Sequence, residues 1–146
     1  MKKPVTVISD TMDADRKQRV VVFRGNVYAK EDFDLCGDVL TVYYDEADET
    51  KEIVAAGNVR IVQGDKRARG EKAVYDREKK AVVITGKPSA MQCADVVDGE
   101  KITFHLDSDR MIVEGRTGER VKATINPKKE CSEGPEREEF KCGAAR

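Results

Sequence analysis

The sequence predicts an all-β protein built from stacked, similar units. Four glycines recur at intervals of 32, 29 and 29 residues, at Gly25, Gly57, Gly86 and Gly115, and each follows a short apolar run. The closest copies are 70–76 (GEKAVYD) and 99–105 (GEKITFH). A fixed period of this size is typical of one supersecondary unit stacked on copies of itself. Turn residues separate the short apolar runs, which indicates that each unit consists of strands.

The expected strands follow in chain order from these apolar runs. The pairs Gly25-Asn26 and Gly57-Asn58 favour tight turns or bulges with positive φ. A polar turn is expected at 13–18, and the acidic stretch 45–50 is expected to be the widest loop of the first half. We find no convincing helical period. The expected strands are 5–8, 19–23, 27–29, 40–44, 53–56, 59–62, 72–75, 81–85, 91–93, 101–106, 110–114 and 120–125.

Apolar residues fall in columns when positions are counted from each repeat glycine. Strand side chains alternate between faces, so equivalent positions point the same way in every unit and form a ladder. Two columns precede the glycine. The column four residues before it is Val21, Ile53, Val82 and Met111, and the column two residues before it is Phe23, Ala55, Ile84 and Val113. Two further columns follow the glycine in the first three units. The column two residues after it is Val27, Val59 and Pro88, and the column four residues after it is Ala29, Ile61 and Ala90. A second ladder on the other arm, facing the first, is expected from Val42 and Tyr44, Ala73 and Tyr75, and Ile102 and Phe104.

The ladders leave two interpretations open. They either close on one another as the dry core of a sandwich or solenoid, or they enclose an apolar slot. A further apolar column, three residues before each glycine, lies on the opposite face and leaves open that inside and outside are reversed. Its members are Val22, Val54, Val83 and Ile112.

Composition limits the classes of function. The 146 residues carry 27 Lys and Arg against 28 Asp and Glu, with 5% aromatic residues and no Trp, so a nucleic-acid partner is not expected. No apolar run approaches the length of a membrane-spanning helix, and no secretory apolar region follows Met1. Residues 1–126 are expected to form one β domain. From 127 to 146 the charged, breaker-rich composition predicts a flexible tail.

The four cysteines match no metal-binding pattern. Cys36, Cys93, Cys131 and Cys142 contain no C-x-x-C spacing, and the chain has a single histidine, so neither a metal site nor a cofactor is expected. Four cysteines allow three disulfide pairings, and the sequence does not choose among them. Cys131 and Cys142 can close a loop within the tail if the compartment is oxidising.

No catalytic constellation is evident, so an enzyme is not expected. His105 occupies the place of Asp76 in the preceding repeat and is interpreted as a turn residue. The acidic groups at 13–15, 32–34 and 45–49 offer carboxylates for calcium or for acid–base work, but each falls where the repeat places a turn. They are interpreted as solvated turns. Neither a G-x-S-x-G nor a phosphate-binding loop motif is present.

Several segments together resemble the OstA-like family of lipopolysaccharide transport. They are 5–10 (VTVISD), 23–27 (FRGNV), 56–59 (AGNV), 74–76 (VYD) and 83–86 (VITG). The resemblance implies an open, twisted β-jellyroll around an apolar slot that binds the acyl chains of lipid A. It also implies a periplasmic location, partners in the inner- and outer-membrane parts of the export machinery, and head-to-tail stacking of protomers through the segments 120–125 and 5–9.

The sequence therefore predicts a periplasmic bridge protein without enzymatic activity that shields the acyl chains during transport. Val5 and Tyr75 match positions where the family contacts lipid, and the other expected contacts rest on the columns. One alternative is a membrane-anchored sister component of the same export route, and another is a β-solenoid assembly module with a dry core. The expected lipid-binding residues are Val5, Val7, Val21, Phe23, Val27, Ile53, Val59, Ile61, Tyr75, Val82, Ile84, Phe104, Met111 and Val113.

Overall fold

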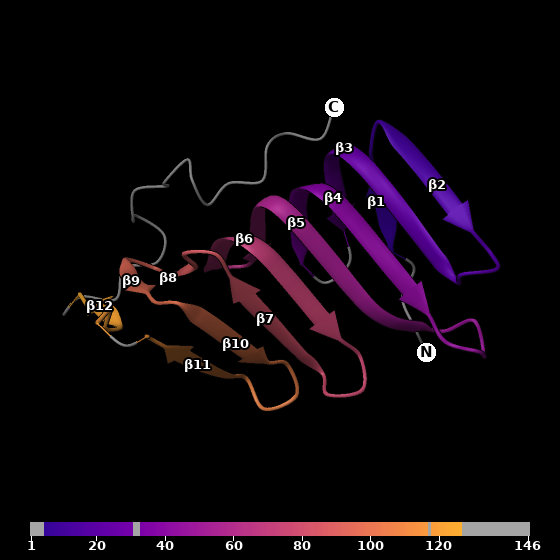
Figure 1. The fold of residues 1–146 in the computed structure, drawn as a ribbon. Helices are drawn as coiled ribbons and strands as arrows, with labels where there is room; N and C mark the ends of the chain where they lie inside the picture. Colours follow the sequence, from indigo (N-terminus) through magenta and orange to yellow (C-terminus); the bar gives the residue numbers. More distant parts are fainter. Residues whose placement is uncertain (1–4, 31–32, 117, 127–146) are drawn as a thin grey trace.

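A computed structural model describes residues 5–30, 33–116 and 118–126, and its regular secondary structure is entirely β-strand (Figure 1). No helix in this part of the chain has the length and apolar character needed to cross a membrane. The strands are β1 (Thr6–Ile8), β2 (Thr11–Asp15), β3 (Val20–Lys30), β4 (Asp34–Tyr44), β5 (Thr50–Gln63), β6 (Lys66–Asp76), β7 (Ala81–Thr85), β8 (Ser89–Gln92), β9 (Asp95–Asp98), β10 (Lys101–His105), β11 (Arg110–Glu114) and β12 (Lys122–Thr124).

The strands form one folded-over antiparallel sheet with two walls. Its main path runs β1-β3-β4-β5-β6-β7-β10-β11, while β2 pairs with β3, β8 pairs with β6 and β9, and β12 pairs with β9. The first wall contains β2, β7, β10, β11 and one half of each long strand β3 to β6. The second wall contains β1, β8, β9, β12 and the other halves of the long strands. This is the predicted all-β, open, twisted β-jellyroll.

Bulges, rather than strand ends, form the corner between the walls. The angle φ is 90° at Gly25 and 44° at Asn26, and it is 83° at Gly57 and 49° at Asn58. The pairing register shifts at both places. A bulge of this kind bends a strand while both of its halves stay paired. Of the two conformations expected here, a tight turn or a bulge with positive φ, the bulge is confirmed. The expectation of separate strands on either side is wrong, because β3 and β5 each continue around the corner.

The expected polar turn at 13–18 is partly wrong, because its first half belongs to β2. This strand pairs with β3 from Thr11↔Arg24 to Asp15↔Val20, and all five of its residues are exposed. Met12 and Ala14 alternate with polar residues, which is the period of a strand with one apolar face. The expected flexible tail at 127–146 and the possible Cys131–Cys142 bond lie outside the described residues.

Candidate functional site: an apolar slot between two walls

The first wall carries two apolar rows, which confirms the columns counted from the repeat glycines. Residues paired across neighbouring strands of a sheet lie side by side and point to the same face. The columns four and two residues before the glycine each fall in a single row. One row is Ala14, Val21, Val42, Ile53, Tyr75, Val82, Phe104 and Met111, and the other is Met12, Phe23, Leu40, Ala55, Ala73, Ile84, Ile102 and Val113.

The expected second ladder is wrong in its position, because it does not face the first. Val42, Tyr75 and Phe104 alternate with the residues of the first column within the same row. The reason is that the two arms of each unit are adjacent antiparallel strands, so their inward side chains stand next to one another.

The facing wall is instead supplied by residues that follow the repeat glycines. Ala29, Ile61 and Ala90, four residues after their glycines, lie in one row of the second wall. The full row is Val7, Ala29, Leu35, Ile61, Ala68, Ala90, Val97 and Ala123. The two walls thus present apolar side chains to each other along the whole sheet.

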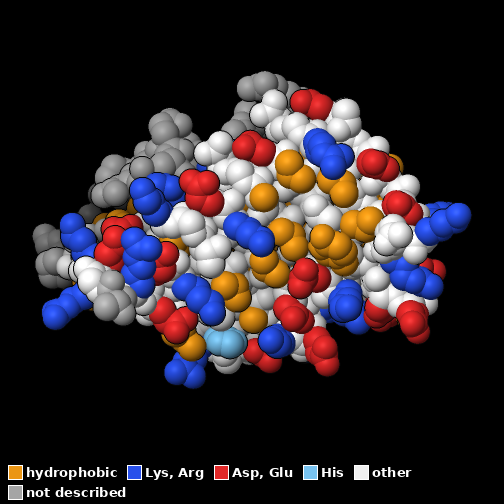
Figure 2. Space-filling view, in the orientation of Figure 1, with side chains coloured by type: hydrophobic (Ala, Val, Ile, Leu, Met, Phe, Trp, Pro, Cys, Tyr) orange, Lys and Arg blue, Asp and Glu red, His pale blue; other side chains and the backbone are white. Residues whose placement is uncertain are grey.

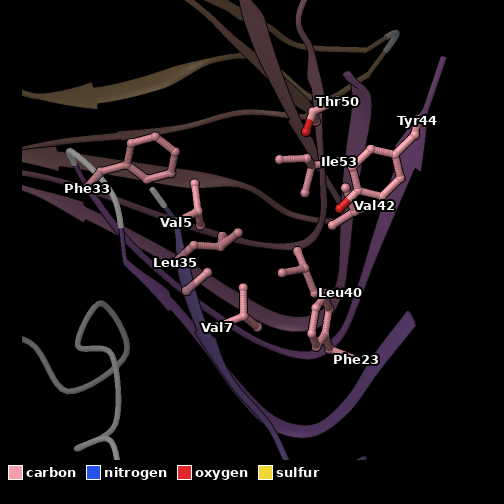
Figure 3. A pocket seen from close by; sticks show the side chains of 11 residues that line it. Val5, Val7, Phe23, Phe33, Leu35, Leu40, Val42, Tyr44, Thr50 and Ile53 are labelled. Carbon is pink, nitrogen blue, oxygen red and sulfur yellow. The ribbon is translucent and has the colours of Figure 1, made fainter. Parts of the chain in front are cut away.

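At the N-terminal end the two walls diverge and leave a slot. Figure 3 shows Val5, Val7 and Leu35 on one side, opposite Phe23, Leu40 and Ile53 on the other, with space between them. The cavity has a volume of about 190 Å³. Its lining is apolar except for Thr50 and the phenol of a tyrosine; it comprises Val5, Val7, Phe23, Ala29, Phe33, Leu35, Leu40, Val42, Tyr44, Thr50 and Ile53.

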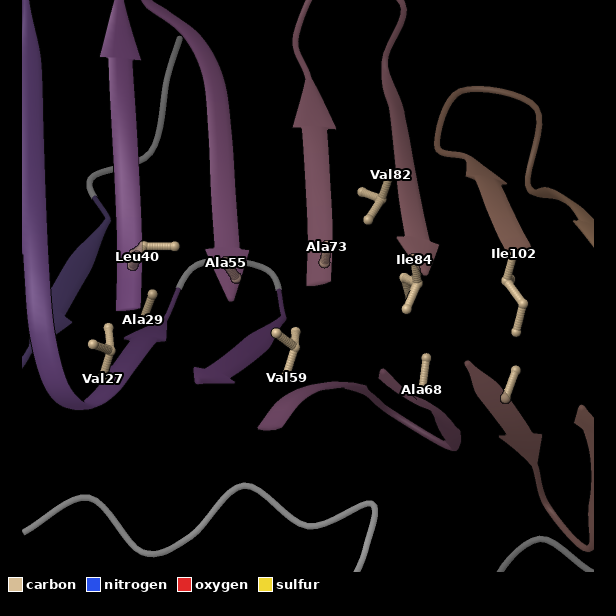
Figure 4. Close-up of a cluster of buried hydrophobic side chains, with 11 residues drawn as sticks. Val27, Ala29, Leu40, Ala55, Val59, Ala68, Ala73, Val82, Ile84 and Ile102 are labelled. Carbon is tan, nitrogen blue, oxygen red and sulfur yellow. The ribbon is translucent and has the colours of Figure 1, made fainter. Parts of the chain in front are cut away.

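Beyond β5 the walls meet and the interior is packed. Val59, Ile84 and Ile102 have no solvent exposure. They belong to one continuous cluster of buried apolar side chains that runs from β3 to β10 (Figure 4). The slot is therefore a feature of the N-terminal half of this structure, and it does not run through the middle of the sheet.

The expected lipid-binding residues divide between these regions. Val5, Val7, Phe23 and Ile53 line the slot. Val27, Val59, Val82 and Ile84 are buried in the core cluster, and Ile61, Tyr75, Phe104 and Val113 pack against it. Val21 is half-buried in the first row, and Met111, on the edge strand β11, is 42% exposed.

The columns missed three large side chains of the lining, Phe33, Leu35 and Leu40. The first two alternate with Asp32 and Asp34, which is the strand period of a half-buried segment. Leu40 is the partner of both Phe23 and Ala55. The columns included only Val42 and Tyr44 of β4, because the irregularity of this strand, between Cys36 and Val39, contains no repeat glycine from which to count.

The other apolar column lies on the outer face, so inside and outside are not reversed. Val22, Val54, Val83 and Ile112 share a row with Thr41, Val74 and Thr103. All of these side chains are β-branched and half-buried, as suits a strand surface. Figure 2 shows apolar side chains gathered in the middle of this face and surrounded by charged ones.

Ion pairs connect the turns at the end of the first wall. Arg77, after β6, contacts Asp45 at 3.1 Å and Glu49 at 2.7 Å, and Arg19 contacts Asp48 at 3.2 Å. The pKa of Arg77 is raised above its ordinary value, mainly by the hydrogen bond from its guanidinium to Glu49. The backbone N–H groups of Ala47 and Glu49 donate to Asp45 Oδ1. The acidic stretch thus closes its own turn and binds arginines, in addition to facing solvent.

Comparisons with known proteins agree with this architecture. The model of the family described as LptA/(LptD N-terminal domain) LPS transport protein matches residues 6–110. The lipopolysaccharide export system protein LptH of Pseudomonas aeruginosa is 28% identical over an alignment length of 145. The match covers 88% of this chain and 82% of that protein.

A solved structure has the same fold. The crystal structure of LptH is described as that of the LptA-homologous periplasmic component of the lipopolysaccharide transport device of P. aeruginosa. It matches with a TM-score of 0.78 at 23% identity, over 86% of this chain and 96% of that one. Because the family model spans well over half of the sequence, the chain belongs to the LptA and LptD N-terminal-domain family of lipopolysaccharide transport proteins.

Proposed function

We propose that the protein is a non-enzymatic periplasmic carrier that holds acyl chains of lipopolysaccharide in the slot between its walls. The apolar slot at the N-terminal end is the observation that supports this most directly. Each acyl methylene removed from water is stabilised by about 0.8 kcal/mol, so a lipid with several chains needs an apolar path across an aqueous compartment. The carrier acts by shielding, and this role needs no catalytic group.

The state of two cysteines supports a periplasmic location. Cys36 and Cys93 are both disulfide-bonded. Disulfides persist in oxidising compartments such as the bacterial periplasm and are rare in the cytosol. The description of LptH as a periplasmic component is consistent with the same location for this chain.

Within this proposal, protomers stack head to tail and so extend both walls. At the N-terminal end the edge strands are β2 in the first wall and β1 in the second, and at the other end they are β11 and β12. Large apolar side chains are exposed at both ends, with Met12 at 62% and Met111 at 42%. Adding β11 of one protomer to β2 of the next, and β12 to β1, pairs free edges and continues the apolar rows. Components in the two membranes would use the same edges.

A photo-crosslinking experiment tests the location of the lipid. Tyr44 lines the slot, whereas Tyr43, its neighbour on β4, points to the outer face and is 40% exposed. Each is replaced in turn by p-benzoylphenylalanine, which is close in shape to tyrosine, and the protein is irradiated with purified lipopolysaccharide. We expect an adduct from position 44 and none from position 43.

The same experiment separates the proposal from its alternatives. Adducts at neither position, in protein that remains folded, would contradict the carrier and favour the β-solenoid assembly module with a dry core. Equal adducts at both positions would indicate adsorption of lipid to the surface.

The head-to-tail stacking is tested by light scattering. We expect the average mass to rise with protein concentration, and the variant Met111→Lys to reduce this rise. Variant Leu106→Lys, at an exposed turn away from the edge, is the control.

A further inference from the structure

The disulfide-bonded cysteines Cys36 and Cys93 are too far apart to bond to each other. Along the sheet, Cys36 is paired with Arg60, Arg60 with Arg69, and Arg69 with Ser89 on β8. Three strand spacings amount to about 14 Å, and Cys93 lies further along the chain beyond β8. A disulfide requires Cα atoms about 4.4–6.8 Å apart. Each of the two cysteines is therefore bonded to a different partner.

The sequence contains only two other cysteines, Cys131 and Cys142. We propose that the C-terminal segment is a covalent strap across the outer face of the second wall, fixed by the bonds Cys93–Cys131 and Cys36–Cys142. In this proposal the segment whose composition predicts a mobile tail is held at two points. The occupant of the outer face is thus the chain itself, and the inference does not depend on what the slot binds.

The position of Asn126 favours one of the two possible pairings. Its N–H donates to Asp95 Oδ1 at 2.7 Å, and its side-chain amide donates to the carbonyl of Ala94 at 2.6 Å. The chain therefore passes beside Cys93 five residues before Cys131, well within reach. Cys36 lies four strand spacings, about 19 Å, from β9, whereas five extended residues span at most about 17 Å, so a Cys36–Cys131 bond would require this segment to be almost fully extended. Cys142, eleven residues further on, has the length to reach it.

Burial on the outer face supports a covering segment. Cys36, Ser89 and Met91 alternate with the inward-pointing residues of the second wall, so they point away from the slot. Their exposures are nevertheless only 3%, 7% and 7%. The strands described at 5–30, 33–116 and 118–126 form a single folded sheet, and none of them packs on this outer face. A further length of chain over these residues accounts for their low exposure.

Charge is complementary between this face and the proposed strap. Arg60, Arg67 and Arg69 lie in the outward rows of β5 and β6 that neighbour Cys36 and Met91. Residues 132–141, between the two tail cysteines, contain four glutamates against Arg137 and Lys141. An acidic strap over a row of arginines gains charge-assisted contacts along its path. The strap ties β8 to β4 and so braces the curl of the second wall from outside.

Mass spectrometry of the full chain, digested without reductant, tests the connectivity. We expect two linked peptide pairs, one joining Cys93 to Cys131 and the other joining Cys36 to Cys142. A Cys131–Cys142 peptide, the reverse pairing, or four alkylatable thiols in freshly purified periplasmic protein would each overturn the proposal.

Proteolysis at glutamate tests whether the segment is docked as well as linked. In the oxidised protein we expect cleavage within 133–139 to be slow, and a thiol reductant should accelerate it several-fold. Cleavage after Glu46, in the exposed loop between β4 and β5, is the internal control and should not change. The variant Arg67→Glu should also accelerate cleavage of the strap with both disulfides intact, whereas Arg110→Glu, exposed on β11, should not. Rapid cleavage in the oxidised wild type would contradict docking.

Discussion

The two halves of the interior are built from the same apolar rows, but the slot opens in the N-terminal half, whereas the middle of the sheet is packed. Near β1 to β5, Val7 and Leu35 face Phe23 across a cavity of about 190 Å³. Near β6 to β10, Ile84 and Ile102 are fully buried in contact with the opposite wall.

Side-chain size on the second wall accounts for the difference. Along the slot its row carries Val7, Ala29 and Leu35, whereas along the packed part it carries Ala68 and Ala90. Small residues let two sheets approach until the facing side chains interlock, whereas large ones on both walls hold them apart. Successive repeats can thus keep the same alternation of apolar and polar residues, although the interior leaves space for a ligand in one region and is packed in another.

The largest expected effect comes from truncating an isoleucine in the packed half. Ile84→Ala removes a fully buried side chain, so we expect the free energy of unfolding to fall by about 2–5 kcal/mol. Ile53→Ala, in the first wall but lining the slot, should cost about 1–2 kcal/mol because that side chain already borders open space. Urea denaturation of both variants measures the difference. Equal losses would mean that the slot is filled or collapsed in solution.

Enlarging an alanine probes the same contrast in the opposite direction. Ala73→Leu inserts three carbon atoms into the packed core, where Ala73 is 4% exposed, and should destabilise the protein by about 1–3 kcal/mol. Ala29 belongs to the same buried cluster and is 7% exposed, but it also borders the slot, so Ala29→Leu has space to extend into and should destabilise the protein less than Ala73→Leu while lipopolysaccharide retention falls. Unfolding curves and bound lipid after purification give the two readouts. Undiminished lipid retention in Ala29→Leu would contradict the slot as the binding site.

The corner that separates the walls gives an effect of similar size to that of Ala73→Leu, confined to one bend of the backbone. Gly57 has φ of 83°, and a Cβ there would lie 2.4 Å from Asp38 Oδ2, so Gly57→Ala should cost roughly 1–3 kcal/mol. Gly64 also has positive φ, at 60°, but nothing lies within 4 Å of the place that a Cβ would occupy, so Gly64→Ala should cost about 1 kcal/mol. Denaturation midpoints compare the two. A larger loss at Gly64 would show that the corner tolerates a side chain.

Sequence patterns predicted the rows well but not the path of the backbone. The position of Ile84 in an inward row follows from the repeat, because strand alternation is local and regular. The continuous bend of β5 at Gly57-Asn58 does not follow, since the same pair of residues suits a turn that ends a strand. β2 was missed for a similar reason, because its acidic residues are typical of turns and its strand state depends on pairing with β3.

The extent of the slot also could not be predicted from the repeat. The column two residues before each glycine treats Phe23 and Ile84 as equivalent, yet only Phe23 borders the slot, and Ile84 is fully buried. The separation of two walls depends on the summed volumes of side chains from strands that are distant in sequence. A period reports which face a residue occupies, and it contains no information about how far away the opposite face lies.

The smallest expected effect concerns the contact that joins the two halves at the end of the first wall. Arg77, in the β6–β7 turn, reaches back to Asp45 and Glu49 in the β4–β5 loop. Because these groups are partly exposed and screened by salt, Arg77→Gln should lower the melting temperature only slightly, and the difference should shrink as sodium chloride is raised. Arg110→Gln, exposed on β11, is the matched control. A large loss that persists in high salt would mean that this turn, more than the packed core, holds the open half in register with the closed half.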